Sequence, residues 1–379
     1  MPTICLIPGD GVGREVIPAA ARALATALPG VQFIEADAGW DCFVRTGAAL
    51  PDATVEAVAG ADGTLFGATQ SPNEVVPGYR SPILALRKRF DLYANLRPTT
   101  NLLSHVPGTR EAPGTSVDLL IVRENTEGLY AGRERREDAD TVIAERVITR
   151  RASERIARVA FEQARRRAAN CKLQIANSRS TNLPIYQSTN LPMYQPTVTI
   201  VHKANVLKLT DGLFREASLA VAREYPDVKV NEMLVDAAAM WLVKDPGRFD
   251  VIVTTNLFGD ILSDEAAGLV GGLGVAPSAN LGAGRAAVCE PVHGSAPDIA
   301  GKGIANPVGA ILSAAMLLDH LGQAAAGDRV RRAVAATVAA GITTPDLGGG
   351  ATTQEVTEDI CRRIAADVES RHGATDING

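Results

Sequence analysis

Two aspartates at helical spacing are the first residues in this chain whose types and positions suggest chemistry. Asp260 and Asp264 are four residues apart in a segment whose apolar residues recur at helical spacing, so both carboxylates are expected on one face of a helix. Like charges at this spacing repel each other unless something positive lies between them, and Mg²⁺ prefers such oxygen ligands. The alternative is a helix start whose acids complement the positive end of the helix dipole.

The segment around these aspartates predicts a strand, a tight turn and a helix. The β-branched run 251–253 is long enough for one buried strand, and 256–259 form a polar break before the helix. An open α/β sheet binds ligands beyond the carboxyl ends of its strands, so both aspartates are expected at a ligand crevice. Asp236, at another predicted strand-to-helix junction, is a third acid that could complete one metal site.

Three arginines are placed near the ends of predicted elements. Arg87 lies on a predicted helix, Arg97 follows a strand predicted over 92–96, and Arg123 follows a strand predicted over 118–122. Planar guanidinium groups match carboxylates with two parallel hydrogen bonds. The three together would suit a di- or tricarboxylate, whereas each one alone is more often a solvated surface charge.

Lys203 stands at the end of a further strand, predicted over 198–201. A lysine that is desolvated or placed beside other cations can act as a base near neutral pH, because both effects lower its pKa. The alternative for Lys203 is an ordinary ion pair with a carboxylate.

The glycine-rich segment 8–13 follows a strand predicted over 4–7 and resembles the start of a dinucleotide-binding fingerprint. The G-x-G-x-x-G spacing is broken, because Arg14 occupies the place of the third glycine. We therefore favour a turn that needs positive φ angles at several glycines over a pyrophosphate cradle.

A second long segment, 290–307, is rich in Gly, Ala and Pro and contains His293, Asp298 and Asn306. Structureless loops of this length are usually functional. Small residues let the backbone approach a ligand closely, and Asp298 could accept hydrogen bonds from ribose hydroxyls while repelling a 2′-phosphate.

Length and composition bound the class of protein. A chain of 379 residues exceeds one core of ordinary size, so two domains of an α/β protein are expected, and the net charge of -5 argues against a nucleic-acid partner. The five cysteines lie far apart without a C-x-x-C pair, which suggests neither disulfides nor zinc and fits the cytoplasm. No segment has the length of a signal-peptide core or a membrane span, so no membrane partner is expected.

An octapeptide is duplicated in the middle of the chain. STNLPIYQ at 180–187 is followed by STNLPMYQ at 188–195. Repeats this short do not build a solenoid, and their Pro, Asn, Ser and Thr content favours a loop. We predict a surface loop insertion at about 172–196, after an amphipathic helix over 152–169.

Six ordered motifs make the chain similar to the β-decarboxylating dehydrogenases of the isocitrate, isopropylmalate and homoisocitrate group. The motifs are GDGVGREV at 9–16, LRKRFDLYANLRP at 86–98, VRENTEGLY at 122–130, HKANVLKLTDGLF at 202–214, NLFGDILSDEAAGLVGGLG at 256–274 and HGSAPDIAGKGIANP at 293–307. They cover nearly the whole chain and omit only the duplicated octapeptide. The resemblance implies a two-domain α/β fold of the isopropylmalate/isocitrate dehydrogenase type, which is not a Rossmann fold.

The resemblance also implies how the chain is divided and assembled. A larger cofactor-binding domain would comprise 1–98 and 271–379, and a smaller substrate and dimerisation domain would comprise 99–270. The active unit would be a homodimer with shared active sites, in which Lys203 and Asp236 reach the neighbouring subunit's site.

Site residues follow from the same resemblance. Tyr130 and Lys203 would be the catalytic acid–base pair. The small di- or tricarboxylate substrate would be bound by Ser81, Arg87, Arg97, Arg123 and Asp236, and Mg²⁺ or Mn²⁺ by Asp236, Asp260 and Asp264. NAD would be bound by His293, Gly294, Ser295, Ala296, Asp298, Ile299 and Asn306. The Asp298–Ile299 pair matches NAD-using members, whereas NADP-using relatives carry Lys-Tyr there.

The segment that begins at Ser81 bears on the choice of substrate. Isocitrate enzymes typically have Ser-x-Asn there, but this chain has Ser81-Pro82-Ile83, which lacks the amide that would meet the γ-carboxylate. The SPI-x-ALR pattern is most similar to homoisocitrate dehydrogenases. We therefore expect oxidative decarboxylation of homoisocitrate first, isocitrate second and 3-isopropylmalate third. A non-catalytic regulatory subunit of a heteromeric isocitrate dehydrogenase would share the fold but should lack some of the catalytic residues.

Overall fold

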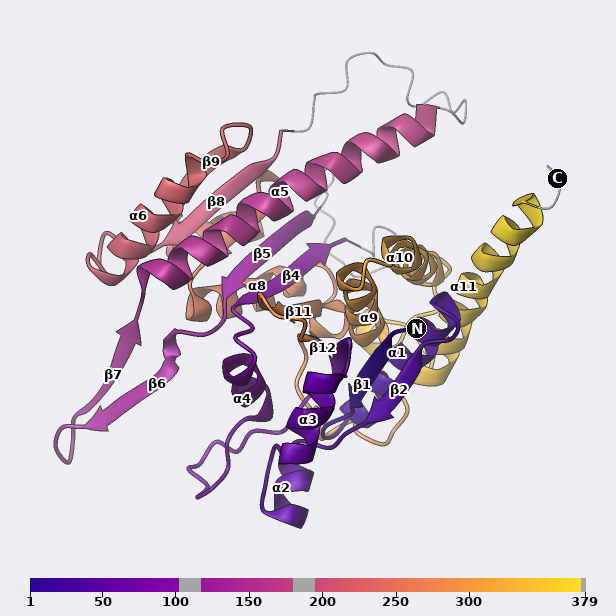
Figure 1. Cartoon of the computed structure of the whole chain (residues 1–379), viewed down its shortest axis with the longest axis horizontal. Coiled ribbons are helices and arrows are strands. Elements are labelled where there is room, and N and C mark those ends of the chain that lie inside the picture. Colours follow the sequence, from indigo (N-terminus) through magenta and orange to yellow (C-terminus); the bar gives the residue numbers. More distant parts are fainter. Residues whose placement is uncertain (102–116, 180–194, 376–379) are drawn as a thin grey trace. The chain divides into compact units, whose positions relative to one another are not determined.

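The computed structural model describes residues 1–101, 117–179 and 195–375. It divides into two compact units, one formed by 1–117 with 263–379 and the other by 118–262 (Figure 1). Each unit contains β-strands and its own covering helices. The assignment of the cofactor to one domain and of the substrate to the other stays a prediction.

The sheet of the first unit has the strand order β2-β1-β3-β12-β11-β4. The strands are β1 (Thr3–Ile7), β2 (Gln32–Glu35), β3 (Gly63–Phe66), β4 (Ala94–Thr100), β11 (Pro277–Leu281) and β12 (Ala287–Pro291). Pairing is parallel from β2 to β12, whereas β11 is antiparallel to both of its neighbours. The central strands β1 and β3 are buried almost throughout, as expected for parallel strands covered on both faces.

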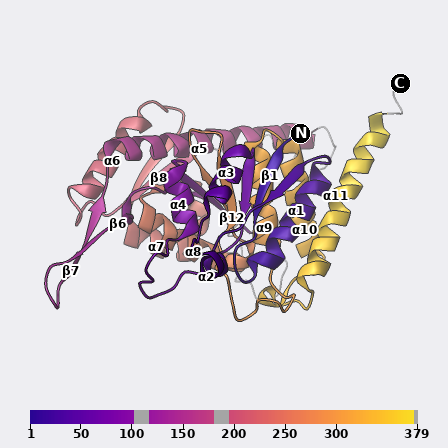
Figure 2. The same ribbon diagram turned by 60° about the horizontal axis from the view of Figure 1, so that its bottom comes forward.

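Helices cover both faces of this sheet. They are α1 (Gly13–Ala27), α2 (Trp40–Thr46), α3 (Asp52–Gly60), α4 (Pro82–Arg89), α9 (Val308–His320), α10 (Ala324–Ala339) and α11 (Thr353–Thr375). On one face α9 packs against β11 and β12, α1 packs against α9, and α10 and α11 form an outer layer (Figure 2). On the other face Val58 of α3 and Leu86 of α4 join Cys5 and Phe66 in one hydrophobic cluster.

The second unit has a parallel sheet in the order β5-β10-β8-β9. Its strands are β5 (Asp118–Glu124), β8 (Thr197–His202), β9 (Lys229–Leu234) and β10 (Val251–Thr254), and its helices include α5 (Arg150–Arg179), α6 (Thr210–Ala222) and α7 (Val235–Lys244). The helices α5 and α6 pack on each other. A last helix, α8 (Asn256–Leu269), begins in this unit and ends in the first.

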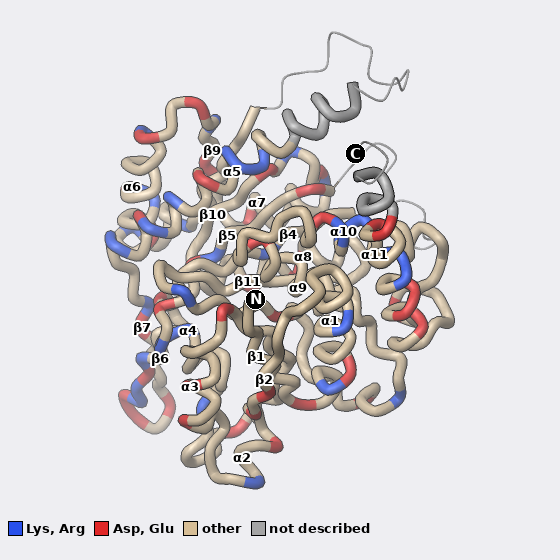
Figure 3. Tube along the Cα trace, turned by 45° about the vertical axis from the view of Figure 1, so that its right-hand side comes forward, with Lys and Arg blue, Asp and Glu red and all other residues tan. Residues whose placement is uncertain are grey.

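Two strands, β6 (Gly128–Arg136) and β7 (Val142–Val147), form a separate antiparallel ribbon. Side chains of β6 beyond Gly128 are exposed, and the ribbon carries charges of both signs (Figure 3). A two-stranded ribbon has no hydrophobic core of its own, so its packing depends on its surroundings.

The structure corrects three local predictions. Arg97 lies inside β4 and not after its end, because the strand continues through Pro98 to Thr100. Residues 94–96 of this strand pair with β11, which was not predicted. Residues 256–259 are the first turn of α8 and not a break, since the first N–H groups of a helix need no intrahelical partner. The helix predicted over 152–169 is α5 and reaches Arg179, so the expected loop does not begin at 172.

The duplicated octapeptides lie outside the described residues, apart from Gln195. The helix α2, the β6–β7 ribbon and β12 were not predicted from the sequence. In the described part of the chain no helix is long and apolar enough to span a membrane, and Cys5, Cys42, Cys289 and Cys361 are free and buried.

Candidate active site

All three predicted arginines are buried. Arg87 is 6% exposed, Arg97 is 8% exposed and Arg123 is 1% exposed. A buried guanidinium group is costly unless it is paired or hydrogen-bonded. None of the three is therefore the solvated surface charge that was the likelier interpretation of each arginine alone.

In the first unit a chain of hydrogen bonds joins two of these arginines. Arg97 Nε donates to Asn95 Oδ1 at 2.7 Å, and Asn95 Nδ2 donates to Asn280 Oδ1 at 2.9 Å. Asn280 Nδ2 donates to Glu290 Oε1 at 2.8 Å, and that oxygen also accepts from Arg87 Nη2 at 3.0 Å. The strands β4, β11 and β12 thus fix both guanidinium groups through a shared polar network.

Arg87 keeps one polar atom without a partner. Its Nε is buried and makes no hydrogen bond within the described residues, which is unusual for a buried donor. Ser81, the residue before α4, is half-buried, and its side chain makes no capping hydrogen bond. The Arg87 Nε–H is thus a donor suited to a carboxylate ligand.

Arg97 also contacts the part of α8 that belongs to the first unit. Its Nη1 donates to Ser263 Oγ at 2.6 Å and to Asp264 Oδ1 at 3.2 Å. The Asp264 side chain remains 50% exposed. One predicted metal ligand is therefore held by a predicted substrate-binding arginine while its carboxylate still faces solvent.

The second unit brings Arg123, Tyr130 and Asp260 together. Arg123 pairs with Asp260 through Nη1, and the Tyr130 hydroxyl donates a hydrogen bond to the same carboxylate. The guanidinium carbon of Arg123 lies 5.1 Å from the centroid of the Tyr130 ring. Gly259 permits this approach, because a Cβ atom there would lie 2.7 Å from Cβ and Cγ of Arg123.

Tyr130 is held in its protonated form. Partial burial raises the pKa of its hydroxyl, and the hydrogen bond to the Asp260 carboxylate and its charge raise this pKa further, while Arg123 acts in the opposite direction. At neutral pH the phenol therefore carries a proton that it can donate.

Lys203 and Asp236 form an ion pair within one chain. The hydrogen bond from Lys203 lowers the pKa of the Asp236 carboxyl group. The Asp236 side chain is 64% exposed and Lys203 is 25% exposed. Within a single chain Lys203 therefore forms the ordinary ion pair that was the alternative to a catalytic base. Its partner, Asp236, is itself a predicted site residue.

The three predicted metal ligands are not gathered in one chain. Among the described residues no three His, Cys, Asp or Glu side chains are close enough to hold a metal ion together. Asp260 and Asp264 are nevertheless one turn apart on α8. Each pairs with an arginine, so those guanidinium groups offset the repulsion between the two carboxylates.

The glycine turn at the N-terminus supports the predicted nucleotide loop. Gly9 and Gly11 have φ angles of 71° and 55°, which confirms the prediction of positive φ values. Val12 N donates to Ser295 O at 2.9 Å, and a Cβ atom at Gly11 would lie 2.0 Å from that same oxygen. The segment 8–13 therefore packs directly against the loop that begins at His293.

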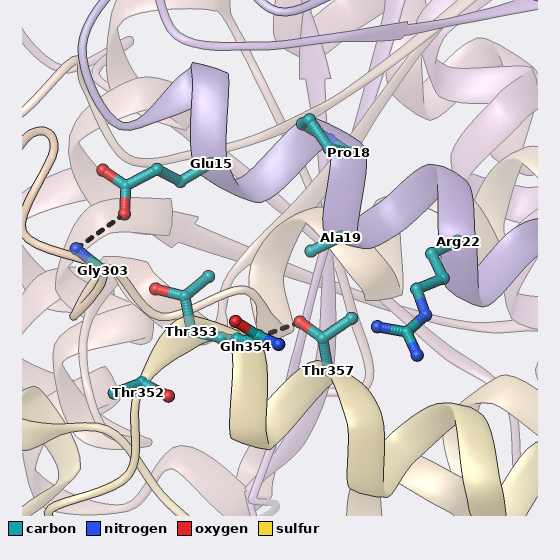
Figure 4. A pocket seen from close by; sticks show the side chains of 9 residues that line it. All are labelled: Glu15, Pro18, Ala19, Arg22, Gly303, Thr352, Thr353, Gln354 and Thr357. Atoms are coloured by element: carbon teal, nitrogen blue, oxygen red, sulfur yellow. Dashed lines mark hydrogen bonds between the residues drawn. The ribbon is translucent and has the colours of Figure 1, made fainter.

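The far side of this loop is anchored by Glu15 of α1. Its carboxylate accepts N–H groups of Gly301 at 2.7 Å and Gly303 at 3.0 Å, and Thr353 N donates to Gly303 O at 2.8 Å. A cavity of about 430 Å³ lies between α1 and the start of α11, beside these contacts (Figure 4). Its Glu15 and threonine oxygen atoms already have partners within the chain.

His293 presents an acceptor without a partner. Its Nδ1 lies 2.9 Å from Gly294 O, and its Nε2 is buried without a hydrogen-bond partner within the described residues. Burial lowers the pKa of the ring, so His293 is neutral at pH 7, with the proton on Nδ1 and a lone pair on Nε2.

Other residues of the predicted cofactor set differ in character. Asn306 accepts Val308 N at 3.0 Å and donates to Asp346 at 3.1 Å, so its side chain is engaged at the start of α9. Gly294 and Asp298 are exposed, Ser295 is buried, and Ala296 and Ile299 are half-buried. Ala296 adopts a φ of 39°, which places a sharp turn in the loop.

Sequence reasoning did not identify the residues that orient the arginines. They are Asn95, Asn280 and Glu290 in the first unit and Asn256 in the second. One signal was available, because Asn95 and Arg97 are two apart in a strand and must share a face. The contacts of Asn280 and Glu290 depend on strands that were not predicted.

Comparisons with known proteins show to which family the chain belongs. A family model described as isocitrate/isopropylmalate dehydrogenase matches residues 3–180 and 188–360. The isocitrate/homoisocitrate dehydrogenase of Thermus thermophilus is 54% identical over 362 residues, which are 95% of this chain and 98% of that protein. The homoisocitrate dehydrogenase of Methanocaldococcus jannaschii is 48% identical over 370 residues, covering 96% and 98%.

A solved structure agrees with these matches. The crystal structure of isocitrate dehydrogenase from Methylococcus capsulatus has a TM-score of 0.83 and 42% sequence identity to this chain, covering 96% of it and 100% of that chain. The fold is thus the expected two-domain type, and the class is that of oxidative decarboxylating dehydrogenases. The chain belongs to the isocitrate/isopropylmalate dehydrogenase family. Members act on small carboxylates and generally need NAD or NADP and a divalent metal.

Proposed function

We propose that this chain catalyses the NAD-linked oxidative decarboxylation of homoisocitrate to 2-oxoadipate, with isocitrate as a second substrate. The observation that carries the proposal is the burial of Arg87, Arg97 and Arg123 with fixed orientations. Buried guanidinium forks suit a substrate with several carboxylates. The names of two relatives, at 54% and 48% identity, favour homoisocitrate.

The acidic residues of α8 fit a hard divalent cation. Asp260 and Asp264 supply carboxylate oxygens one turn apart, and their side chains are 30% and 50% exposed. With Asp236 from a neighbouring subunit they would hold Mg²⁺ or Mn²⁺, which take oxygen ligands and usually share them with substrate. When bound, such a cation stabilises negative charge on the substrate oxygen during oxidation and decarboxylation.

The remaining steps belong to side chains of this chain. The three arginines bind and orient the substrate carboxylates, with Ser81 and Asp236 as further contacts. A base assisted by Lys203 would take the proton of the C2 hydroxyl while bound NAD would accept the hydride from C2, and the carboxylate on C3 would then leave as CO₂. Tyr130, whose raised pKa keeps its proton in place, delivers that proton to C3.

NAD is favoured over NADP by the nucleotide loop. Asp298 is exposed at the loop surface, where its carboxylate would repel a 2′-phosphate and accept from a ribose hydroxyl. The unpartnered Nε2 of His293 is a further acceptor for the nucleotide. Replacing Asp298–Ile299 by Lys-Tyr should shift the preference toward NADP, and an unchanged preference would contradict this assignment.

A homodimer is supported by the surface around Asp236. Met240 and Val243 follow Asp236 at helical spacing on α7 and are 52% and 58% exposed. Ile261, beside Asp260, is 58% exposed. Met240 and Val243, on the α7 face that carries Asp236, suit burial against a second copy, which would bring Lys203 and Asp236 to a shared site.

A panel assay tests the substrate. NADH production should give the highest kcat/KM with homoisocitrate, a lower value with isocitrate and the lowest with 3-isopropylmalate. A clear preference for isopropylmalate would overturn the proposal. That alternative is favoured by Leu84 of α4, which is 39% exposed three residues after Ser81 and could contact an apolar substrate tail.

A further inference from the structure

Asp211 is a fully buried carboxylate beside Lys203. It lies in the first turn of α6 and is 0% exposed. Its Oδ2 accepts the backbone N–H of Lys203 at 2.6 Å, and its Oδ1 forms an ion pair with Arg146 Nη2 at 2.7 Å. One carboxylate thus contacts both the backbone of Lys203 and a cation from β7.

The backbone of Lys203 is held on both sides. Its carbonyl oxygen accepts the N–H groups of Val206 and Leu207, both at 2.9 Å, and Asp211 N donates to Leu207 O at 3.0 Å. The turn between β8 and α6 is therefore closed on itself, and the carboxylate of Asp211 fixes its first peptide.

Arg146 also contacts the start of α8. Its Nη2 donates to Thr255 Oγ1 at 2.7 Å, and its guanidinium carbon lies 4.5 Å from the centroid of the Phe258 ring. Thr255 directly precedes α8, and Phe258 lies in its first turn, two residues before Asp260. The pair of Asp211 and Arg146 therefore links the Lys203 turn to the helix that begins the acidic site.

A buried ion pair of this kind is weak evidence for stability, because both charges lose their hydration. Burial raises the pKa of Asp211 and lowers the pKa of Arg146. Burial therefore disfavours the charged form of each group, and the opposite charge of the other group offsets this effect. Such pairs can be retained because they specify one geometry.

We propose that Asp211, acting through Arg146, is a positioning residue that fixes Lys203 at the end of β8, from where Lys203 reaches the neighbouring subunit's site. The inference rests on the proposed catalytic role of Lys203. Misplacing a reacting group by about 1 Å can cost on the order of 100-fold in rate, so loss of the restraint should appear in kcat.

The same strand provides a matched control at its other end. Asp250 Oδ2 accepts the backbone N–H of Thr197 at 2.9 Å, and Asp250 Oδ1 pairs with Arg167 Nε at 2.8 Å. Thr197 begins β8, whereas Lys203 follows its last residue. The Asp250 side chain is 12% exposed. Each aspartate thus accepts a backbone N–H at one end of β8 and pairs with an arginine, and the two differ in their distance along the strand from Lys203.

The test compares D211N with D250N in the full-length enzyme with saturating Mg²⁺ and NAD. Both should lower the melting temperature, but only D211N should lower kcat, by about 10- to 100-fold, with the KM for NAD within about twofold. Equal kcat values for the two variants would overturn the inference. R146M and R146K provide a second route if D211N does not fold, with a loss of kcat expected for R146M and recovery for R146K.

The K203M variant tests the catalytic role of Lys203 separately from its positioning by Asp211 and Arg146. If K203M loses decarboxylation while D211N and R146M keep full kcat, Lys203 is catalytic and the positioning role is wrong. If K203M retains full kcat, the proposed role of Lys203 fails and the positioning role fails with it.

Discussion

Arg123 and Asn256 are joined by two hydrogen bonds, which run to the same Oδ1 atom from Nε at 3.0 Å and from Nη2 at 2.8 Å. Asn256, the first residue of α8, therefore accepts hydrogen bonds along one edge of the Arg123 guanidinium group. The other terminal nitrogen, Nη1, pairs with Asp260. The orientation of Arg123 thus depends on the planar fork and not only on its charge.

Replacing Arg123 by lysine should remove this orientation while keeping the positive charge. A lysine has a single ammonium group that cannot make both contacts, so we expect kcat/KM for the preferred substrate to fall by about 100-fold, consistent with about 3 kcal/mol from lost charge-assisted hydrogen bonds. The matched control is R135K, because Arg135 is an exposed arginine paired with Glu145 at 2.8 Å. Similar losses for both variants would contradict the role of the fork.

Tyr130 should titrate differently with and without a divalent cation. Its pKa lies above the ordinary value of 10.0 because of burial, the hydrogen bond to Asp260 and the Asp260 charge. A cation bound at Asp260 would weaken the last two effects, so Mg²⁺ should lower this pKa. Phenolate absorbance, measured as the difference between the native enzyme and Y130F, follows the change, and identical titrations with and without Mg²⁺ would count against a metal at Asp260.

His293 should make cofactor binding depend on pH. Because burial lowers its pKa below 6.5, the ring is neutral at pH 7, and its Nε2 becomes a donor only in more acidic solution. Affinity for NAD should therefore fall as the pH is lowered, and H293F should lose about fivefold at neutral pH, as for one hydrogen bond. Calorimetric titration measures both, and the acid-dependent loss should be absent in H293F.

Removal of divalent metal should abolish turnover. Excess chelator is expected to reduce activity by at least about 100-fold, because the enolate charge formed on decarboxylation loses its counter-ion. Added Mn²⁺ should restore activity in the native enzyme but not in D260N. Normal turnover in chelator would remove the basis for a metal site on α8.

Deletion of one octapeptide copy should leave the enzyme intact. The family model matches the chain on both sides of 181–187 but not within it, so a single copy satisfies the family pattern. A variant lacking 188–195 should keep its melting temperature and its kcat within about twofold, because the remaining copy keeps the chain that the family model matches. A loss of activity above about tenfold would show that the duplication affects dimer contacts.

The prediction of elements succeeded where a strong pattern was sufficient. The buried strand over 251–253, the helix after it and the strand over 4–7 were predicted from apolar runs and spacing. The β6–β7 ribbon was missed because the side chains of β6 beyond Gly128 are exposed and show no alternating apolar face, and α2 was missed because it has only 7 residues. The strand predicted over 92–96 instead runs from Ala94 to Thr100 and passes through Pro98, since a proline is tolerated in a strand where its missing N–H is not needed for pairing.

The amino-acid sequence by itself determined the family, the order of the motifs and the identity of the three arginines, because residue types and their spacing are local properties of the chain. Only the tertiary structure decided that those arginines are buried and how they are oriented. Asn95, Asn280 and Glu290 meet because strands distant in sequence pair side by side. The contact of Asp211 with Arg146 arises in the same way, since a buried charge takes whichever partner the fold places within reach.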